Sequence, residues 1–268
     1  MDKFTLLKQY FGHDAFRPGQ EAVIDAVFGG RDTLAVMPTG GGKSLCYQIP
    51  ALMLPGLTLV VSPLISLMQD QVLALQENGI GAACINSSRS HEELQDIYRG
   101  LRAGAYKLLY AAPERLEAPG FSALLQSLPL SLVAVDEAHC ISQWGQDFRP
   151  SYLKIHDFLV RLPQRPILAA FTATATEAVR ADILRALALR DPFCIVTGFD
   201  RPNLYFDVLQ PANRAASLRC LLEERRGKSG IVYCATRAAV ERVCADLNAH
   251  GIRAVRYHAG LEDDERRQ

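Results

Sequence analysis

Short apolar runs separated by amphipathic stretches make up most of the chain. The apolar runs predict buried strands over residues 33–37, 57–62, 82–85, 106–111, 131–135, 167–171 and 193–196. Helical spacing of apolar residues predicts helices over 4–11, 18–28, 64–75, 92–101 and 177–187, with another beginning at 43. Strands that alternate with helices need crossover connections. The pattern therefore predicts the α/β class, with a largely parallel, buried sheet.

A domain boundary is expected near residues 198–202 (GFDRP), because a second α/β pattern begins there. Beyond it, strands are predicted over 203–209, 230–234 and 253–257, and helices up to 224 and over 237–250. We therefore expect a first domain over 1–198 and the beginning of a second over 199–268. The second stretch is shorter than a typical domain of about 100 to 150 residues, so we expect it to be incomplete.

The composition is that of a globular protein with a substantial core. Apolar residues make up 49% of the chain and the formal net charge is zero, so binding to nucleic acid would depend on local groups. The seven cysteines include no C-x-x-C pair, which argues against a disulfide framework or a zinc cluster. There is no recognisable signal peptide and no apolar run of transmembrane length. We expect a cytoplasmic protein, nucleoid-associated if bacterial, without membrane contact.

The segment after the first predicted strand has the pattern of a phosphate-binding loop. Its small residues form a turn before a helix, where backbone N–H groups and the helix dipole attract anions. Lys43 would reach the β- and γ-phosphates of ATP, and the Ser44 hydroxyl would bind Mg²⁺. The full pattern has glycine in place of Met37, and a glycine-rich turn with an accidental Gly-Lys-Ser is the alternative. The loop residues are Thr39, Gly40, Gly41, Gly42, Lys43 and Ser44.

Two acids follow the predicted strand over residues 131–135. Asp136 would hold Mg²⁺, through water, and Glu137 would orient and polarise the attacking water. Alone, Asp-Glu after a strand is more often a helix N-terminus with favourable acids. Downstream of a phosphate-binding loop in the same sheet, we interpret the pair as the second half of an ATPase site. The carboxyl ends of parallel strands share one edge, so Lys43, Ser62 and Thr172 are expected at the same edge.

Three motifs resemble, in this order, those of superfamily 2 helicases: GGGKS at 40–44, DEAH at 136–139 and FTATA at 171–175. Three further stretches resemble the RecQ family of DNA helicases, namely FRPGQ at 16–20, CISQWGQDFRP at 140–150 and YHAGL at 257–261. The resemblance covers the chain essentially end to end. It implies a RecA-like parallel sheet flanked by helices, followed by the start of an incomplete second RecA-like domain. It also implies ATP and Mg²⁺ as cofactors and DNA as the partner.

The resemblance implies that residues near the N-terminus recognise the nucleotide base. Gln20 would read adenine, while His13 and Arg17 would stack on its ring. Taken alone, Gln20 would be an ordinary surface helix residue, and only the surrounding FRPGQ favours the base contact. The catalytic set implied by the resemblance is Lys43, Asp136, Glu137 and His139.

The loop after DEAH resembles the aromatic-rich loop by which the family couples DNA binding to ATP hydrolysis. Trp144 and Phe148 would stack on unpaired bases, and Arg149 would meet phosphate or the nucleotide site. A lone tryptophan is otherwise more often a core residue. Gln146 departs from the histidine that is usual in the family, which bears on the strength of coupling. Ser142 and Gln143 belong to the same loop.

The remaining implied contacts lie in both predicted domains. His139 would link the ATP site to Thr172 and Thr174, where hydrolysis meets strand movement. Ser62 and Ser66 would contact the backbone of single-stranded DNA, with helix capping an equal alternative for Ser66. The predicted second domain would add contacts to DNA phosphate from Thr236, Arg237 and His258.

We therefore expect the N-terminal motor portion of an ATP-dependent 3′–5′ DNA helicase, acting on single strands or on duplexes with a single-stranded tail. The family's arginine finger, worth roughly 10³ to 10⁵ in turnover, would lie beyond residue 268. Hydrolysis and unwinding by this chain are accordingly expected to be poor. Two alternatives stay open: a superfamily 2 motor acting on RNA, and a truncated product that only binds nucleotide or DNA.

Overall fold

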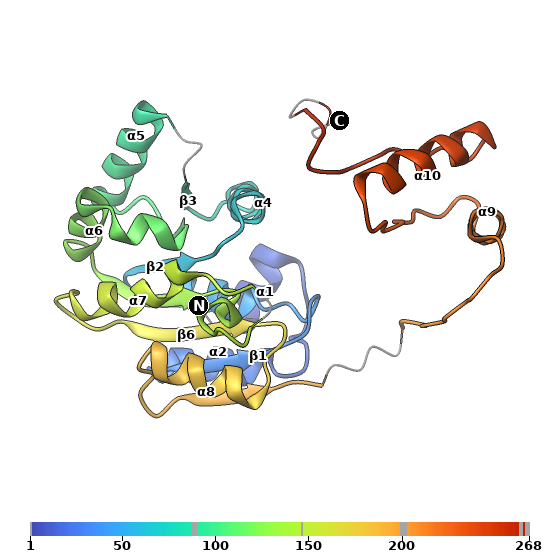
Figure 1. Ribbon diagram of the computed structural model, residues 1–268. Coiled ribbons are helices and arrows are strands. Elements are labelled where there is room, and N and C mark those ends of the chain that lie inside the picture. Colours follow the sequence, from blue (N-terminus) through green and yellow to red (C-terminus); the bar gives the residue numbers. More distant parts are fainter. Residues whose placement is uncertain (1, 87–89, 146, 199–202, 263–264, 266–268) are drawn as a thin grey trace. The chain divides into compact units, whose positions relative to one another are not determined.

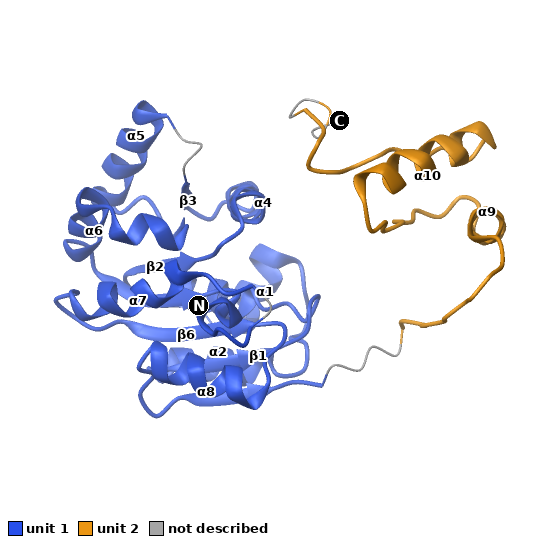
Figure 2. Ribbon diagram, in the orientation of Figure 1, with its two compact units in different colours: residues 1–200 blue, residues 201–268 orange. Residues whose placement is uncertain are grey.

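A computed structural model describes residues 2–86, 90–145, 147–198, 203–262 and 265. The chain divides into two compact units, residues 1–200 and 201–268, which Figure 2 colours separately. The division lies next to the expected boundary, most of which (199–202) is outside the described residues. Each unit is considered by itself.

Unit 1 contains a seven-stranded sheet in which the described neighbours all pair in parallel (Figure 1). The order across the sheet is β3-β4-β2-β5-β6-β1-β7. The predicted α/β class with a parallel, buried sheet is thus confirmed. The strands are β1 (Thr33–Val36), β2 (Leu57–Val61), β3 (Ala82–Ile85), β4 (Leu108–Ala111), β5 (Leu130–Val135), β6 (Ile167–Thr172) and β7 (Phe193–Val196).

Helices cover both faces of this sheet. The helices of unit 1 are α1 (Lys3–Phe11), α2 (Gln20–Phe28), α3 (Leu45–Met53), α4 (Ile65–Glu77), α5 (His91–Arg102), α6 (Pro119–Gln126), α7 (Pro150–Val160) and α8 (Glu177–Ala186), with short 3₁₀ helices η1 (Pro113–Glu117) and η2 (Ala138–Ile141). Because successive strand residues point to opposite faces, Val60 packs in a core cluster with α2, α3 and α4, whereas Leu59 packs with α5, α6, α7 and α8.

The strand order brings four candidate segments to one edge of the sheet. Strands β2, β5, β6 and β1 are consecutive neighbours. Ser62 follows β2, Asp136 follows β5, Thr172 ends β6, and the glycine-rich loop follows β1. Since all these strands run in the same direction, their carboxyl ends form one continuous edge, where ligands bind in open α/β sheets.

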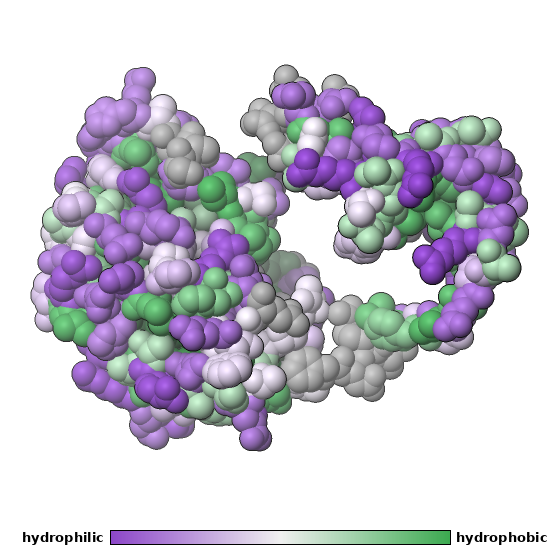
Figure 3. Space-filling model, viewed as in Figure 1, coloured by the Kyte–Doolittle hydropathy of each residue, from purple (hydrophilic) through white to green (hydrophobic). Residues whose placement is uncertain are grey.

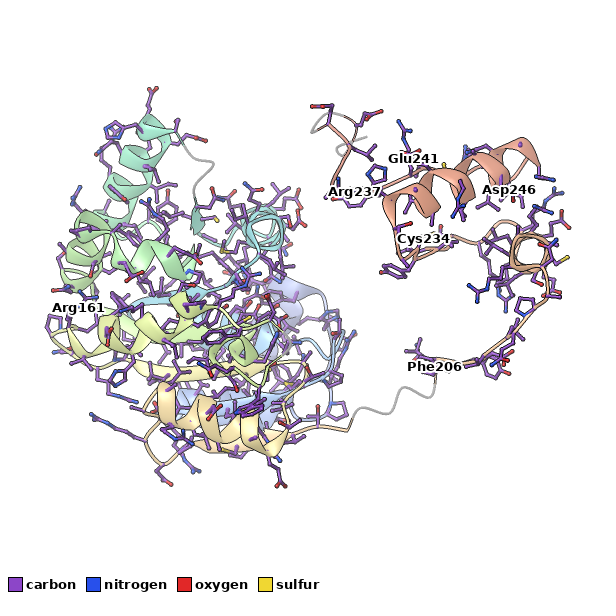
Figure 4. All side chains as sticks on the ribbon, viewed as in Figure 1. Arg161, Phe206, Cys234, Arg237, Glu241 and Asp246 are labelled. Carbon is purple, nitrogen blue, oxygen red and sulfur yellow. The ribbon has the colours of Figure 1, made fainter. Side chains whose placement is uncertain are left out.

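Unit 2 contains two described helices, α9 (Arg214–Glu224) and α10 (Arg237–Ala249). They are joined by Arg219 Nη1, which donates to both carboxylate oxygens of Asp246, at 2.9 and 2.6 Å. Figure 4 labels Asp246 on α10.

The strands predicted over 203–209, 230–234 and 253–257 are wrong, because no strand is assigned among the described residues of unit 2. A strand needs a neighbour that accepts and donates its backbone hydrogen bonds. Without one, apolar side chains of these segments are left at the surface (Figures 3 and 4), as the exposures of Phe206 (85%), Tyr233 (90%) and Val255 (93%) indicate. The segments have strand composition but no sheet.

None of the helices in the described part of the chain is both long and apolar enough to cross a membrane.

Candidate nucleotide site and nucleic-acid interface

The loop between β1 and α3 turns sharply because two glycines adopt left-handed backbone conformations. The φ angle is 78° at Gly40 and 76° at Gly42, a region that other residues rarely occupy. A Cβ atom at Gly42 would lie 2.2 Å from Gln20 Nε2, and one at Gly41 would lie 2.8 Å from the carbonyl oxygen of Pro38. Glycine is therefore required both by the backbone angles and by the space available. Such a loop before a helix suits a phosphate group.

Hydrogen bonds hold both polar side chains at the end of this loop. Lys43 Nζ donates to the carbonyl oxygen of Met37 at 3.3 Å, and Ser44 Oγ accepts from Gln71 Nε2 at 2.9 Å. Met37 itself, which departs from the full loop pattern, is 1% exposed and packs in the core beside Cys46. The Met37 side chain thus packs in the core beneath the loop, and the Met37 carbonyl group positions Lys43.

Gln20 contacts the loop and not an open base-binding surface. Its side chain is 1% exposed, its Nε2 donates to the carbonyl oxygen of Gly42 at 2.9 Å, and its Oε1 accepts from the backbone N–H of Arg17 at 2.7 Å. The Arg17 guanidinium donates to the carbonyl oxygen of Gly40, and His13 is exposed. Contact of Gln20 with adenine requires these bonds to open, so it stays a prediction.

Asp136 is buried at the end of β5, where its backbone N–H donates to the carbonyl oxygen of Val61 at 2.9 Å. Burial, and then the charge of Glu137, raise the pKa of Asp136 to about 6, against opposing effects of Lys43 and His139. Lys43 also lowers the pKa of Glu137, after the larger effect of its hydrogen bond with His139. The lysine and both acids therefore share one electrostatic environment.

His139 joins the end of β5 to the end of β6. Its Nδ1 lies 2.9 Å from Thr172 Oγ1 and 3.2 Å from Glu137 Oε2. The Thr172 hydroxyl donates to the carbonyl oxygen of Thr174 at 3.1 Å, so its oxygen is left to accept from His139. The Cys140 sulfur and the Glu137 carboxylate raise the pKa of His139 above its usual value, which favours the imidazolium. The structure thus brings these residues together.

The segment after η2 presents the single tryptophan to solvent. Trp144 is 79% exposed, Gln143 is exposed and Phe148 is half-buried, whereas Ser142 is only 1% exposed. An exposed indole is not a core residue, so the core alternative for Trp144 is wrong. Gln146 lies outside the described residues.

Arg149 connects this segment to the end of β2. Its Nε and Nη2 donate to Asp147 Oδ2 at 3.0 and 2.9 Å, and its Nη1 donates to the carbonyl oxygen of Pro63 at 3.4 Å. The preceding residue, Ser62, is 2% exposed, and its hydroxyl oxygen has no hydrogen-bond partner among the described residues. Ser66 is exposed in the first turn of α4.

The three candidates of unit 2 lie around the N-terminus of α10. Thr236 Oγ1 accepts from the backbone N–H of Ala239 at 3.2 Å and so caps the helix. His258 Nε2 lies 2.8 Å from Glu241 Oε1, and Arg237 is exposed (Figure 4). Two of the three side chains therefore have structural partners within unit 2.

The residues of unit 1 fit ATP and Mg²⁺. Within the described ranges, no group of three or more His, Cys, Asp or Glu side chains could hold a metal ion. Mg²⁺ is commonly held by one or two protein oxygens together with phosphate oxygens and water. Asp136 and Ser44 supply such oxygens, and Lys43 and the glycine loop supply positive charge and N–H groups for phosphate.

Several residues that support the site were not among those predicted. Gln71 donates to Ser44, Asp182 accepts from Ser142 Oγ at 2.7 Å, and Tyr152 donates to the carbonyl oxygen of Asp136 at 2.9 Å. A signal existed for Gln71, because it lies between Met68 and Leu75 on the apolar face of its helix, where a polar residue needs a buried partner.

A sequence model of the DEAD/DEAH box helicases matches residues 17–182. The chain therefore belongs to the DEAD/DEAH box helicase family. The predicted resemblance to RecQ helicases is also confirmed, since the chain is 49% identical over 265 residues to the ATP-dependent DNA helicase RecQ of Bacillus subtilis and 48% identical over 263 residues to that of Pasteurella multocida.

Each of these two alignments covers 98% of this chain, but only 45% of the first relative and 42% of the second. The chain thus spans less than half the length of these two relatives. In fold, it is similar to a crystal structure of the helicase MrfA bound to DNA and AMPPNP, with a TM-score of 0.76, 18% identity, and coverage of 100% of this chain and 41% of that one.

Proposed function

We propose that unit 1 binds ATP with Mg²⁺ and, beside it, single-stranded DNA, as the motor portion of a 3′–5′ DNA helicase. The observation that carries this proposal is the common edge formed by the ends of β2, β5, β6 and β1. That edge holds the phosphate loop, the acid pair and the segments around Ser62 and Trp144. The names of the relatives, which are ATP-dependent DNA helicases, agree with it.

In this proposal each polar group at the edge has one task. Lys43 neutralises the β- and γ-phosphates, while Ser44 and Asp136 hold Mg²⁺. Bound Mg²⁺ offsets phosphate charge. Glu137 orients the attacking water. His139 transmits changes at the acid pair to Thr172, because its Nδ1 lies 2.9 Å from Thr172 Oγ1.

DNA would lie along the segments that follow β2 and η2. Trp144 offers an exposed face for stacking on a base, which every base can do irrespective of sequence. Arg149, which contacts both Asp147 and Pro63, supplies a cation beside the residue that follows Ser62. We further propose contacts of Thr236, Arg237 and His258 with DNA phosphate. For this chain we also propose slow turnover of ATP.

Equilibrium binding of a fluorescent ATP analogue with Mg²⁺ tests the nucleotide site. Lys43→Ala should weaken binding about ten- to a hundredfold, since it removes a charge-assisted hydrogen bond to phosphate. Lys154→Ala, which removes an exposed lysine of α7, is the control and should bind as the unsubstituted chain does. Unchanged affinity in Lys43→Ala, with the fold intact by circular dichroism, would exclude the proposed site.

The nucleic acid is tested by comparing single-stranded DNA and RNA of the same sequence, both in binding and in stimulation of ATP hydrolysis. We expect preference for DNA and low turnover. Equal stimulation by RNA would instead support an RNA motor. Binding of DNA without any hydrolysis would support a non-catalytic binding role, and turnover typical of two-lobed helicases would refute the slow-turnover proposal.

A further inference from the structure

The hydroxyl of Ser142 links the exposed tryptophan segment to helix α8. Ser142 is 1% exposed, and its Oγ donates to Asp182 Oδ2 at 2.7 Å while accepting from the backbone N–H of Trp144 at 3.2 Å. The carbonyl group of Ser142 also accepts from the backbone N–H of Gly145 at 2.9 Å. One buried hydroxyl therefore fixes the backbone on which the tryptophan is carried.

Asp182 can serve as an anchor because α8 is itself firmly held. Thr176 caps the helix by accepting from the backbone N–H of Val179 at 3.3 Å. Val179 and Ile183 are buried in the main core cluster, at 3% and 0% exposure. Asp182 lies between them on the same helix and also pairs with Arg185, at 3.4 Å. The hydrogen bond to Ser142 thus joins the tryptophan segment to a helix whose position is set by the core.

We propose that Asp182 is a positioning residue that holds Trp144 ready for DNA through the Ser142 hydroxyl. The relevance to DNA rests on the proposed function. Hydrogen bonds to a charged acceptor are among the stronger ones in proteins, and this one is shielded from water on the Ser142 side. Removing the carboxylate leaves the Ser142 hydroxyl without its acceptor and releases the backbone at Trp144.

In the sequence, helix α8 also comes directly after the segment that contacts His139. Thr172 ends β6, Thr174 accepts from it, and α8 begins three residues later. Segment 138–145 is therefore tied to one continuous stretch of chain at two points, through His139–Thr172 and through Ser142–Asp182. Both ties lie close to the acid pair and to Trp144, so the stretch 172–182 contacts this segment at each of its ends.

Because the chain contains one tryptophan, its fluorescence reports on this segment without any label. Steady-state anisotropy and acrylamide quenching of Trp144 are measured on the full chain without nucleic acid. Asp182→Ala should lower the anisotropy and increase quenching, whereas Asp182→Asn, which keeps an oxygen acceptor for the Ser142 hydroxyl, should restore most of both. Arg185→Ala removes the ion pair on α8 but keeps the hydrogen bond, and should leave both signals unchanged.

Binding of fluorescein-labelled oligothymidylate then gives the functional readout. Asp182→Ala should bind about tenfold more weakly, with Asp182→Asn and Arg185→Ala close to the unsubstituted chain. Unchanged anisotropy in a folded Asp182→Ala, or an equal loss in Arg185→Ala, would overturn the positioning role. If no variant binds DNA, the proposed function fails, but the anisotropy still decides whether Asp182 holds the segment.

Discussion

Gln71 Nε2 lies 2.9 Å from Ser44 Oγ, so the candidate Mg²⁺ ligand is held by a side chain of helix α4. Gln71 Oε1 in turn accepts from Gln48 Nε2 at 2.9 Å and from the Tyr110 hydroxyl at 3.3 Å. Gln48 and Tyr110 are 6% and 1% exposed. Since α4 begins just after the Ser62 segment, the orientation of Ser44 depends on a helix next to the proposed DNA contact.

Gln71→Leu should weaken binding of nucleotide in the presence of Mg²⁺ and also lower the free energy of unfolding. The leucine has a similar size but leaves Gln48 and Tyr110 without this acceptor, and an unsatisfied buried polar group costs about 1 to 3 kcal/mol. Gln69→Leu makes the same change at an exposed position of the same helix and is the control. Thermal melting and nucleotide titration of both variants measure the difference, and equal behaviour of the two would rule out a role for the Gln71 contacts.

Gly42→Ala should reduce nucleotide affinity by more than backbone strain explains. A left-handed conformation costs an ordinary residue roughly 1 kcal/mol or more, and the new Cβ would also lie 2.2 Å from Gln20 Nε2, displacing the side chain that holds the loop. Gly79→Ala is a matched control, because Gly79 has the same φ of 76° but no atom within 4 Å of the added Cβ. Melting temperatures and nucleotide affinities are compared. If Gly79→Ala lowers the melting temperature as much as Gly42→Ala, the contact with Gln20 is unimportant.

All seven strands of unit 1 were predicted from sequence to within two residues at each end. Parallel strands covered by helices on both faces are apolar almost throughout, as in β2, where every residue from Leu57 to Val61 is buried and only Thr58 is polar. Helices α6 and α7 were not predicted, although each begins at a proline, which is favoured in the first helical turn.

The same reasoning fails in unit 2 for a physical reason. Segments such as 253–257 contain residue types that favour strands, which is a local property, but strand formation depends on a neighbour elsewhere in the chain. Val255, at 93% exposure, has the residue type of a strand without the burial. A sequence pattern therefore predicts which secondary structure a segment favours. Whether a strand forms depends on backbone hydrogen bonds to a neighbouring strand.

The common edge of the site could be predicted because it follows from strand direction alone. The individual contacts could not, since they depend on side-chain distances. The 2.9 Å contact of His139 with Thr172 agrees with the predicted pairing. No sequence pattern indicated the hydrogen bonds of Gln20 to the glycine loop or of Ser142 to Asp182.

Titration of Asp136 should change the free energy of unfolding and the affinity for nucleotide in opposite directions. The pKa of Asp136 is about 6 in the folded protein, above its usual value of 3.8. The main cause is burial of the carboxyl group. The folded state thus binds the proton more tightly than the unfolded chain, so this group lowers the free energy of unfolding as pH rises from about 4 to 6, by about 3 kcal/mol in all. Binding of Mg²⁺ requires the carboxylate, so affinity for nucleotide with Mg²⁺ should instead fall about tenfold per pH unit below 6.

Asp136→Asn separates the two effects. The amide keeps an oxygen to accept from the backbone N–H of Glu137, which donates to Asp136 Oδ1 at 3.0 Å, but it carries no charge to be desolvated. Without nucleotide, this variant should melt several degrees higher than the unsubstituted chain at pH 7 and equally at pH values below about 4. At pH 7 it should also lose affinity for nucleotide in the presence of Mg²⁺. Asp70→Asn, at an exposed position of α4, should change neither property. A variant at Asp136 that is no more stable at pH 7 would show that burial of the carboxylate carries no cost, and that the site does not trade stability for metal binding.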